Sequence, residues 1–144
     1  MEPILISACL LGAACRYDGG SNPVLSVEAL MGRCQLVPVC PEQLGGLATP
    51  RPPAERWGDR VVTKDGADVT EAYRRGAEET LRLCRLLGCE AAVLKERSPS
   101  CGYGEIYDGT HSGTLTAGEG ATAALLAANG IPVYGESQIE QLMK

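Results

Sequence analysis

Four short apolar runs constrain the fold of this chain more than any other feature. They cover residues 4–8, 35–39, 91–95 and 131–134. Apolar runs of this length, bounded by turn residues, are typical of strands buried on both faces of a parallel sheet. Strands that alternate with helices are joined by right-handed crossovers, which place helices on both faces of the sheet. The sequence therefore predicts a three-layer α/β sandwich with a mainly parallel, Rossmann-like sheet.

Helix signals fill most of the gaps between these runs. Asn22 and Pro23 suit an N-cap and a first helical position, and residues 69–87 have apolar side chains at helical spacing and end at Gly88. Segments rich in Gly and Pro exclude regular structure, and loops that long are usually functional. The expectation is helices over 24–32, 69–87, 119–129 and 137–143, an edge strand over 61–64, and irregular segments over 9–22, 43–60 and 96–119.

Size and charge narrow the class of protein. A chain of 144 residues predicts one domain, residues 1–144, with a real core. The net charge is −5 and no face is basic, so binding of polymeric nucleic acid is not expected. No apolar stretch reaches the roughly 20 residues of a membrane span, and no secretory signal pattern begins the chain. We therefore expect a cytoplasmic protein with no membrane partner.

The cysteines are the residues that carry chemistry. Seven is an odd number, which in a reducing compartment favours free, metal-bound or catalytic thiols over a disulfide framework. Cys9, Cys40 and Cys101 each follow a predicted strand, and Cys15 lies in the loop after the first. Because the carboxyl ends of parallel strands meet at one edge, these thiols are expected to converge on a metal site there. The others are expected to be small buried hydrophobes away from that edge: Cys34, Cys84 and Cys89.

The spacing of the cysteines bears on which metal they could bind. Structural zinc prefers four ligands, often from C-x-x-C pairs, and this sequence contains no such pair. Iron–sulfur clusters accept thiolates from separated loops, and three ligands on a four-iron cluster would leave one iron open to substrate. Cys15 as a fourth ligand would close the cluster and favour electron transfer. A zinc or redox-sensing module that uses all four of these cysteines is the alternative from a different class.

Polar side chains flank two of these thiols. Glu42 lies two residues after Cys40, where a carboxylate can act as a general acid or base. Ser98 and Ser100 lead into Cys101, and a hydroxyl there could contact a cluster, position a substrate or relay a proton. Solvated loop positions are the alternative for each of these side chains.

A third polar group follows the first strand. Arg16, Tyr17 and Asp18 precede two glycines and offer a cation, an aromatic ring and backbone N–H groups. Such a segment can cradle a planar ligand or a phosphate, although a simple turn is an equal alternative. We take these three residues, with Ser100, as candidate substrate contacts. No P-loop, nucleophile elbow or H-E-x-x-H motif is present in the sequence.

Together these segments resemble a known family over residues 4–136. The chain is similar to the family catalogued as domain of unknown function 523, whose best understood members are thiouracil desulfurases. The resemblance rests on six motifs in the same order: Ser7-Ala8-Cys9-Leu10-Leu11-Gly12, Cys15-Arg16-Tyr17-Asp18-Gly19, Val39-Cys40-Pro41-Glu42, Thr49-Pro50-Arg51-Pro52-Pro53-Ala54-Glu55, Lys95-Glu96-Arg97-Ser98-Pro99-Ser100-Cys101-Gly102 and Ile106-Tyr107-Asp108-Gly109-Thr110.

The resemblance implies a specific chemistry. Thiouracil desulfurases are similar α/β proteins with one 4Fe-4S cluster on three cysteines, which match Cys9, Cys40 and Cys101. Their assisting acid and serine match Glu42 and Ser98. The implied reaction converts a thio-nucleobase or thio-nucleotide, such as thiouracil, to the oxo compound and hydrosulfide without net redox change. A sulfur-transfer protein that accepts sulfide on the open iron and passes it on is the alternative.

Overall fold

A parallel sheet of four strands lies at the centre of this protein, whose computed structural model describes residues 2–143. The strand order is β2-β1-β5-β8, and every pairing in the sheet is parallel. The four strands predicted from the apolar runs are all present, and the parallel, Rossmann-like sheet is confirmed. Their bounds are β1 Glu2–Ser7, β2 Cys34–Val39, β5 Ala92–Leu94 and β8 Val133–Gly135.

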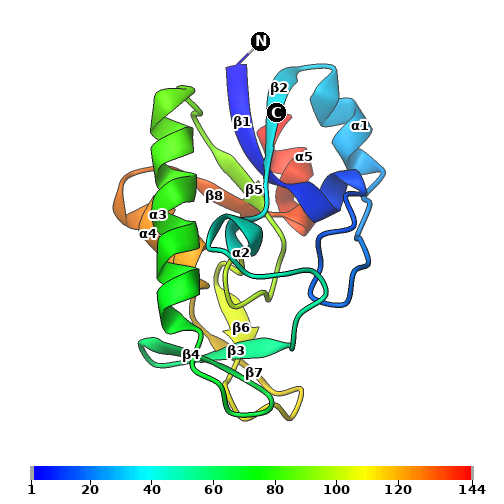
Figure 1. Ribbon diagram of the computed structural model, residues 1–144. Helices are drawn as coiled ribbons and strands as arrows, with labels where there is room; N and C mark the ends of the chain where they lie inside the picture. Colours follow the sequence, from blue (N-terminus) through cyan, green and yellow to red (C-terminus); the bar gives the residue numbers. More distant parts are fainter. Residues whose placement is uncertain (1, 144) are drawn as a thin grey trace.

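Helices cover both faces of this sheet, which confirms the three layers (Figure 1). α3 (Thr70–Leu86) packs with α4 (Ala121–Ala128) on one face. α1 (Ser26–Met31) packs with α5 (Ile139–Leu142) on the other. Two short 3-10 helices follow strands of the sheet: η1 (Ala8–Leu11) follows β1, and η2 (Glu136–Gln138) follows β8. Within residues 2–143, no helix has both the length and the apolar character to cross a membrane.

Alternate residues of β1 enter two separate hydrophobic cores, as the pleat of a strand requires. Ile4 and Ile6 lie in the core beneath α1 and α5, with Leu30. Leu5 lies in the opposite core beneath α3 and α4, with Leu126. Ile6, Leu5, Leu30 and Leu126 have no exposed surface. Burial of the central strand on both sides fixes its register and therefore the position of the residues that follow it.

Two β-hairpins form a second region at the carboxyl edge of the sheet, below it in Figure 1. β3 (Ala54–Trp57) pairs with β4 (Arg60–Thr63), and β6 (Glu105–Tyr107) pairs with β7 (Leu115–Ala117), both antiparallel. The prediction that residues 43–60 and 96–119 are irregular is therefore wrong. Strands of three or four residues carry too little periodicity to stand out among Gly and Pro, and Gly58, at φ +58°, allows a two-residue turn.

Two local predictions near the ends of strands are also corrected. A short helix, α2 (Pro41–Leu44), begins directly after Cys40 and extends into the segment 43–60, which was expected to be irregular. α1 begins at Ser26 rather than Val24, and Asn22 does not cap it. The amide oxygen of Asn22 instead accepts a hydrogen bond from Arg16 Nη1 at 2.9 Å. Asn22 therefore serves the loop after β1 and not the helix.

The order of the strands creates a crevice beside β1. The chain leaves β1 for β2 at one edge and then returns across β1 to β5, so the direction of winding reverses there. Ligands of open α/β sheets bind outside the carboxyl ends of the strands at such a switch point. Cys9 follows β1, Cys40 follows β2 and Cys101 lies beyond β5, so all three belong to this side of the sheet.

Candidate active site

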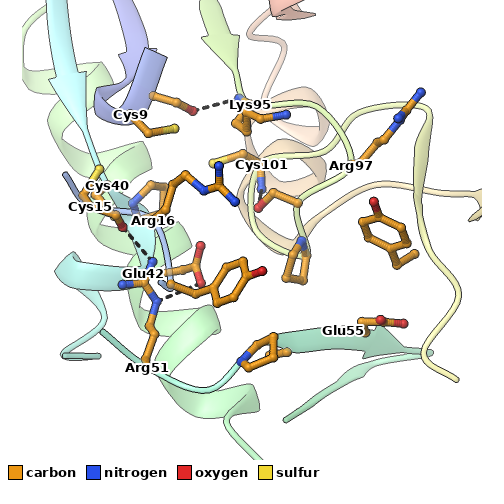
Figure 2. A pocket seen from close by; sticks show the side chains of 18 of the residues that line it. Cys9, Cys15, Arg16, Cys40, Glu42, Arg51, Glu55, Lys95, Arg97 and Cys101 are labelled. Carbon is orange, nitrogen blue, oxygen red and sulfur yellow. Dashed lines mark hydrogen bonds and ion pairs between the residues drawn. The ribbon is translucent and has the colours of Figure 1, made fainter. Parts of the chain in front are cut away.

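A cavity of about 560 Å³ lies between the strand ends and the two hairpins (Figure 2). Its volume is typical of sites for small molecules, which range from about 300 to 1,000 Å³. The predicted thiols Cys9, Cys40 and Cys101 line it, and so does Cys15. The structure thus brings together side chains that are up to 92 residues apart in sequence (101 − 9).

Each of the three predicted ligands is positioned by the end of a different strand. Cys9 lies on η1 directly after β1, Cys40 joins β2 to α2, and Cys101 lies in the loop between β5 and β6. Burial raises the pKa of the Cys101 thiol to about 12, and burial also raises that of Cys9. Cys9 and Cys101 are therefore neutral thiols unless a bound metal supplies positive charge and displaces their protons.

The thiols are spread around the cavity and do not meet at the position of a single metal ion. Among residues 2–143, no three His, Cys, Asp or Glu side chains are grouped so as to hold one metal ion. Ligands spread around a space suit a body of several atoms, with each thiolate on a different iron. The donor set of Cys9, Cys40 and Cys101 therefore fits a polynuclear cluster.

Cys15 is the fourth thiol of the cavity. Its side chain is buried, and desolvation, followed by the charge of Cys40, raises its pKa to about 12. Its carbonyl oxygen accepts from the Cys40 thiol at 3.7 Å and from Arg51 Nη2 at 2.9 Å. The backbone of Cys15 thus links the loop after β1 to the turn that carries Cys40.

Glu42, in the first turn of α2, lines the same cavity (Figure 2). Its side chain is 17% exposed. Tyr73 Oη donates to Glu42 Oε1 at 2.5 Å, and Arg51 Nε donates to the same oxygen at 3.2 Å. A carboxylate that lines a cavity beside three thiols is correctly located for general acid–base work.

The two serines before Cys101 occupy different places. Ser98 lines the cavity, and its Oγ accepts the backbone N–H groups of Ser100 and Cys101, both at 3.1 Å. Ser100 is fully buried, and its hydroxyl lies 2.8 Å from that of Thr122 on α4. The structure therefore brings Ser98 to the thiols and places Ser100 behind the wall of the cavity.

The segment after Cys15 divides in a similar way. Arg16 and Tyr17 line the cavity, with the Arg16 guanidinium 5.8 Å from the Tyr17 ring centre. Asp18 lies outside it, where its carboxylate pairs with Arg16 Nη2 at 3.3 Å and accepts the N–H of Gly20 at 2.9 Å. Asp18 thus orients Arg16 and closes its own turn.

The sequence analysis assigned no role to Arg51 and Tyr73, which donate hydrogen bonds to Glu42, or to Glu55, which lines the cavity on the side of the hairpins. Arg51 and Glu55 lie in the motif at residues 49–55, which was left without a role, and Tyr73 lies within the predicted helix at residues 69–87. Glu55 Oε1 accepts the backbone N–H groups of Gly109 and His111 at 3.0 and 3.1 Å, which joins the two hairpins. The one signal available was the presence of two charged residues, Arg51 and Glu55, in the Pro-rich segment at residues 49–55.

The chain is similar to known proteins over nearly its whole length. The sequence model of the 2-thiouracil desulfurase family matches residues 4–138. The uncharacterised protein YbbK of Bacillus subtilis (strain 168) is 42% identical over 150 residues, which cover 97% of this chain and 99% of YbbK. The solved structure of the [4Fe-4S]-dependent thiouracil desulfidase TudS superimposes with a TM-score of 0.95 at 51% identity and covers 99% of this chain and 96% of TudS.

Proposed function

The chain belongs to the 2-thiouracil desulfurase family, and from this premise we propose that it is a [4Fe-4S]-dependent enzyme that removes sulfur from a thiolated nucleobase or nucleotide. One observation carries the proposal. Three thiols from three strand ends, two of them buried and that of Cys40 partly buried, border a cavity that the Glu42 carboxylate also lines. This arrangement offers both the ligands of a cluster and a group able to activate water.

Cys9, Cys40 and Cys101 are the residues that would hold the cluster. Burial disfavours the thiolate forms of Cys9 and Cys101, and the positive charge of a bound cluster would offset that cost. When bound, a cluster with three protein ligands supplies a Lewis-acidic iron with an open position for a sulfur ligand. The cavity leaves room beside the thiols for one planar base.

The protein's own side chains then handle protons. Glu42 accepts a proton from water, whose oxygen attacks the thiocarbonyl carbon. Ser98 Oγ already accepts two backbone N–H groups, so its own hydroxyl proton is the one that can be donated toward the reacting group. Water supplies the new C–O bond, the C–S bond breaks and sulfur leaves as hydrosulfide. No electrons are gained or lost, so no redox cofactor enters the balance.

Arg16 and Tyr17 are the proposed contacts for the rest of the substrate. They lie on the wall of the cavity, where a guanidinium and an aromatic ring can receive a planar, carbonyl-bearing base. Asp18 would act through Arg16, and Ser100 through the backbone that precedes Cys101. A free base, a nucleoside or a nucleotide would each present the same thiocarbonyl, whereas polymeric nucleic acid is not expected. The cytoplasm is the proposed location, because thiols and a cluster persist in a reducing compartment.

Anaerobic reconstitution tests the proposal. After incubation with iron and sulfide, the protein should show broad visible absorption and convert thiouracil to uracil and sulfide in equal amounts. About one zinc per chain without acid-labile sulfide would contradict it in favour of a zinc module. Sulfide passed to an acceptor without formation of uracil would contradict it in favour of a sulfur-transfer protein.

A further inference from the structure

The Glu42 carboxylate is held asymmetrically. Tyr73 and Arg51 both donate to Oε1, whereas Oε2 receives no hydrogen bond from residues 2–143. Within these residues, no fully buried side-chain nitrogen or oxygen lacks a partner, so Oε2 retains some solvent-accessible surface. An Arg–carboxylate pair frequently uses both carboxylate oxygens in a fork. Here Arg51 and Tyr73 both bind one oxygen of Glu42, and we call this arrangement the clamp. It leaves the second oxygen available to the cavity.

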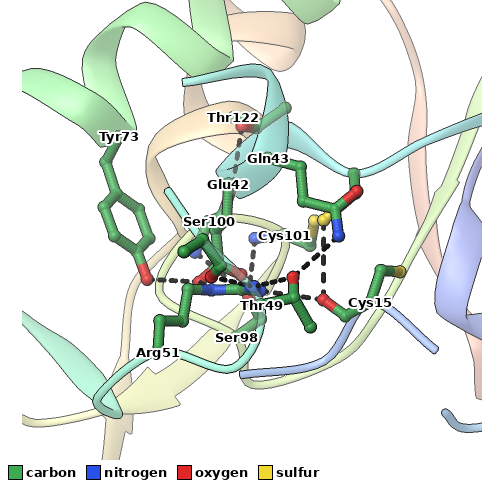
Figure 3. Close-up of polar contacts among 12 residues, drawn as sticks. Cys15, Glu42, Gln43, Thr49, Arg51, Tyr73, Ser98, Ser100, Cys101 and Thr122 are labelled. Carbon is green, nitrogen blue, oxygen red and sulfur yellow. Dashed lines mark hydrogen bonds and ion pairs between the residues drawn. The ribbon is translucent and has the colours of Figure 1, made fainter. Parts of the chain in front are cut away.

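The two donors are themselves fixed. The Arg51 side chain is only 5% exposed, and its other nitrogens donate to Cys15 O at 2.9 Å and Thr49 Oγ1 at 2.9 Å (Figure 3). Tyr73, in the first turn of α3, is 2% exposed. Neither donor can follow Glu42 if that side chain changes its rotamer. The clamp therefore restricts Glu42 rather than moving with it.

Close approach of two helices makes the clamp possible. A Cβ added to Gly76 on α3 would lie 1.9 Å from the carbonyl oxygen of Pro41, and one added to Gly45 would lie 1.9 Å from that of Ala72. α2 and α3 thus meet backbone to backbone. This contact sets the distance over which the Tyr73 hydroxyl reaches Glu42.

Both donors keep their protons. Burial, and then the negative charge of Glu42, raises the pKa of Tyr73 far above its usual value, so its hydroxyl stays a donor. For Arg51, burial lowers the pKa, but the charge and hydrogen bond of Glu42 outweigh it and leave the pKa raised. The clamp thus combines one neutral donor with one cation.

We infer that Arg51 and Tyr73 are positioning residues, which hold Glu42 by Oε1 so that Oε2 faces the water to be activated. The inference rests on the proposed function. A flexible carboxylate with three rotatable bonds samples many orientations, and a displacement of about 1 Å in a reacting group can cost about 100-fold in rate. Both residues line the cavity, and their role in the proposal is to act through Glu42 rather than on the substrate.

Two variants test this inference in the reconstituted protein with thiouracil. Tyr73→Phe should lower kcat about 10-fold and Arg51→Gln about 100-fold, with KM within about 2-fold, because orientation and not substrate binding is lost. Visible absorption and iron content should be unchanged. Tyr134→Phe on β8 and Arg82→Gln, in an exposed ion pair on α3, are matched controls that should keep wild-type kcat. Wild-type kcat in both clamp variants would overturn the inference.

A double-mutant cycle separates positioning from general structural damage. Glu42→Asp keeps a carboxylate but shortens it away from both donors. In this background Tyr73→Phe should change kcat by less than about 2-fold, since the contact is already lost. An equal loss in both backgrounds would overturn the inference, because it would show that Tyr73 acts independently of Glu42.

Failure of the proposed function has a different signature. If the wild-type protein releases no sulfide from thiouracil, the proposed activity is wrong whatever the variants do. The clamp is then judged by thermal unfolding of the cluster-free protein. Non-additive Tm changes for Tyr73→Phe and Glu42→Ala would support the contact, and additive changes would overturn it.

Discussion

The cavity has two walls that are built by different means. One, the sheet-edge wall, is carried by strand ends and the short elements that follow them: Cys9, Cys40, Glu42, Ser98 and Cys101. The other, the hairpin wall, is carried by β3 and by β6 with the loop that follows it: Ala54, Glu55, Tyr107, His111 and Gly113. The first rests on fully buried residues of the sheet, such as Leu5 and Ile6. The second is joined across the hairpins by the Glu55 carboxylate and by the close approach of Gly109 to Trp57.

From this difference we expect the sheet-edge wall to carry the reacting groups and the hairpin wall to affect substrate binding. Groups mounted on a buried sheet keep their geometry because any movement disturbs two cores. Groups on hairpins at the surface can vary with little cost to the fold. Changes in the sheet-edge wall should therefore alter the cluster or kcat, and changes in the hairpin wall should alter KM.

The largest expected effect is loss of the cluster. Cys9→Ser, Cys40→Ser and Cys101→Ser should each abolish the broad visible absorption after anaerobic reconstitution, because a hydroxyl is a poor iron ligand. Cys84→Ser is the control, since that thiol is buried in the core beneath α3 and donates to Cys89 O at 3.7 Å. Loss of absorption in the Cys84 variant together with its retention in the Cys101 variant would refute the assignment.

The next effect concerns the helix contact behind the sheet-edge wall. Gly76→Ala forces a Cβ to within 1.9 Å of Pro41 O, so it should separate α2 from α3 and move Glu42. Overpacking of this kind costs about 1–3 kcal/mol, which lowers Tm by roughly 3–10 °C in a domain of this size. kcat should fall as well. Arg82→Ala, on the exposed side of the same helix, should leave both values unchanged. Unchanged Tm and kcat in Gly76→Ala would show that this contact positions nothing.

The part of the site that sequence could predict is the part that strands position. The apolar runs before Cys9, Cys40 and Cys101 specify a buried parallel sheet, and the carboxyl ends of such strands share one edge. Convergence of the three thiols follows from that topology alone. Cys84 and Cys89 likewise lie in the core, as their places on a helix face and at a strand start indicate.

The rest depends on contacts that no local pattern encodes. Tyr73 and Glu42 are 31 residues apart, and their hydrogen bond requires the close packing of α2 on α3. The direction of the Ser100 hydroxyl is set by Thr122, 22 residues away on α4. Both hairpins were missed because strands of three or four residues give little periodicity. Side-chain direction and hairpin pairing therefore become visible only in three dimensions.

A smaller effect tests the hairpin wall. Gly109 has φ +96°, and an added Cβ would lie 2.7 Å from Trp57 Cε3, so Gly109→Ala should push the loop after β6 away from β3. KM for thiouracil should rise several-fold while kcat and visible absorption stay unchanged. Gly104→Ala is the matched control, because Gly104 has φ +88° but no atom within 4 Å of its added Cβ. Loss of the cluster in Gly109→Ala, or equal KM values in the two variants, would contradict the assignment of substrate binding to the hairpin wall.

The smallest expected effect, at Cys15, bears most directly on the nature of the centre. Cys15 lines the cavity beside the sheet-edge wall, and its backbone carbonyl accepts the hydrogen bonds from Cys40 and Arg51. Cys15→Ser preserves that backbone, so visible absorption, iron content and kcat should match the wild-type protein. Loss of the absorption would make Cys15 a fourth ligand, with no iron left open to a thiocarbonyl sulfur. The cavity would then hold a closed cluster suited to electron transfer, and the role of the sheet-edge wall in catalysis would have to be abandoned.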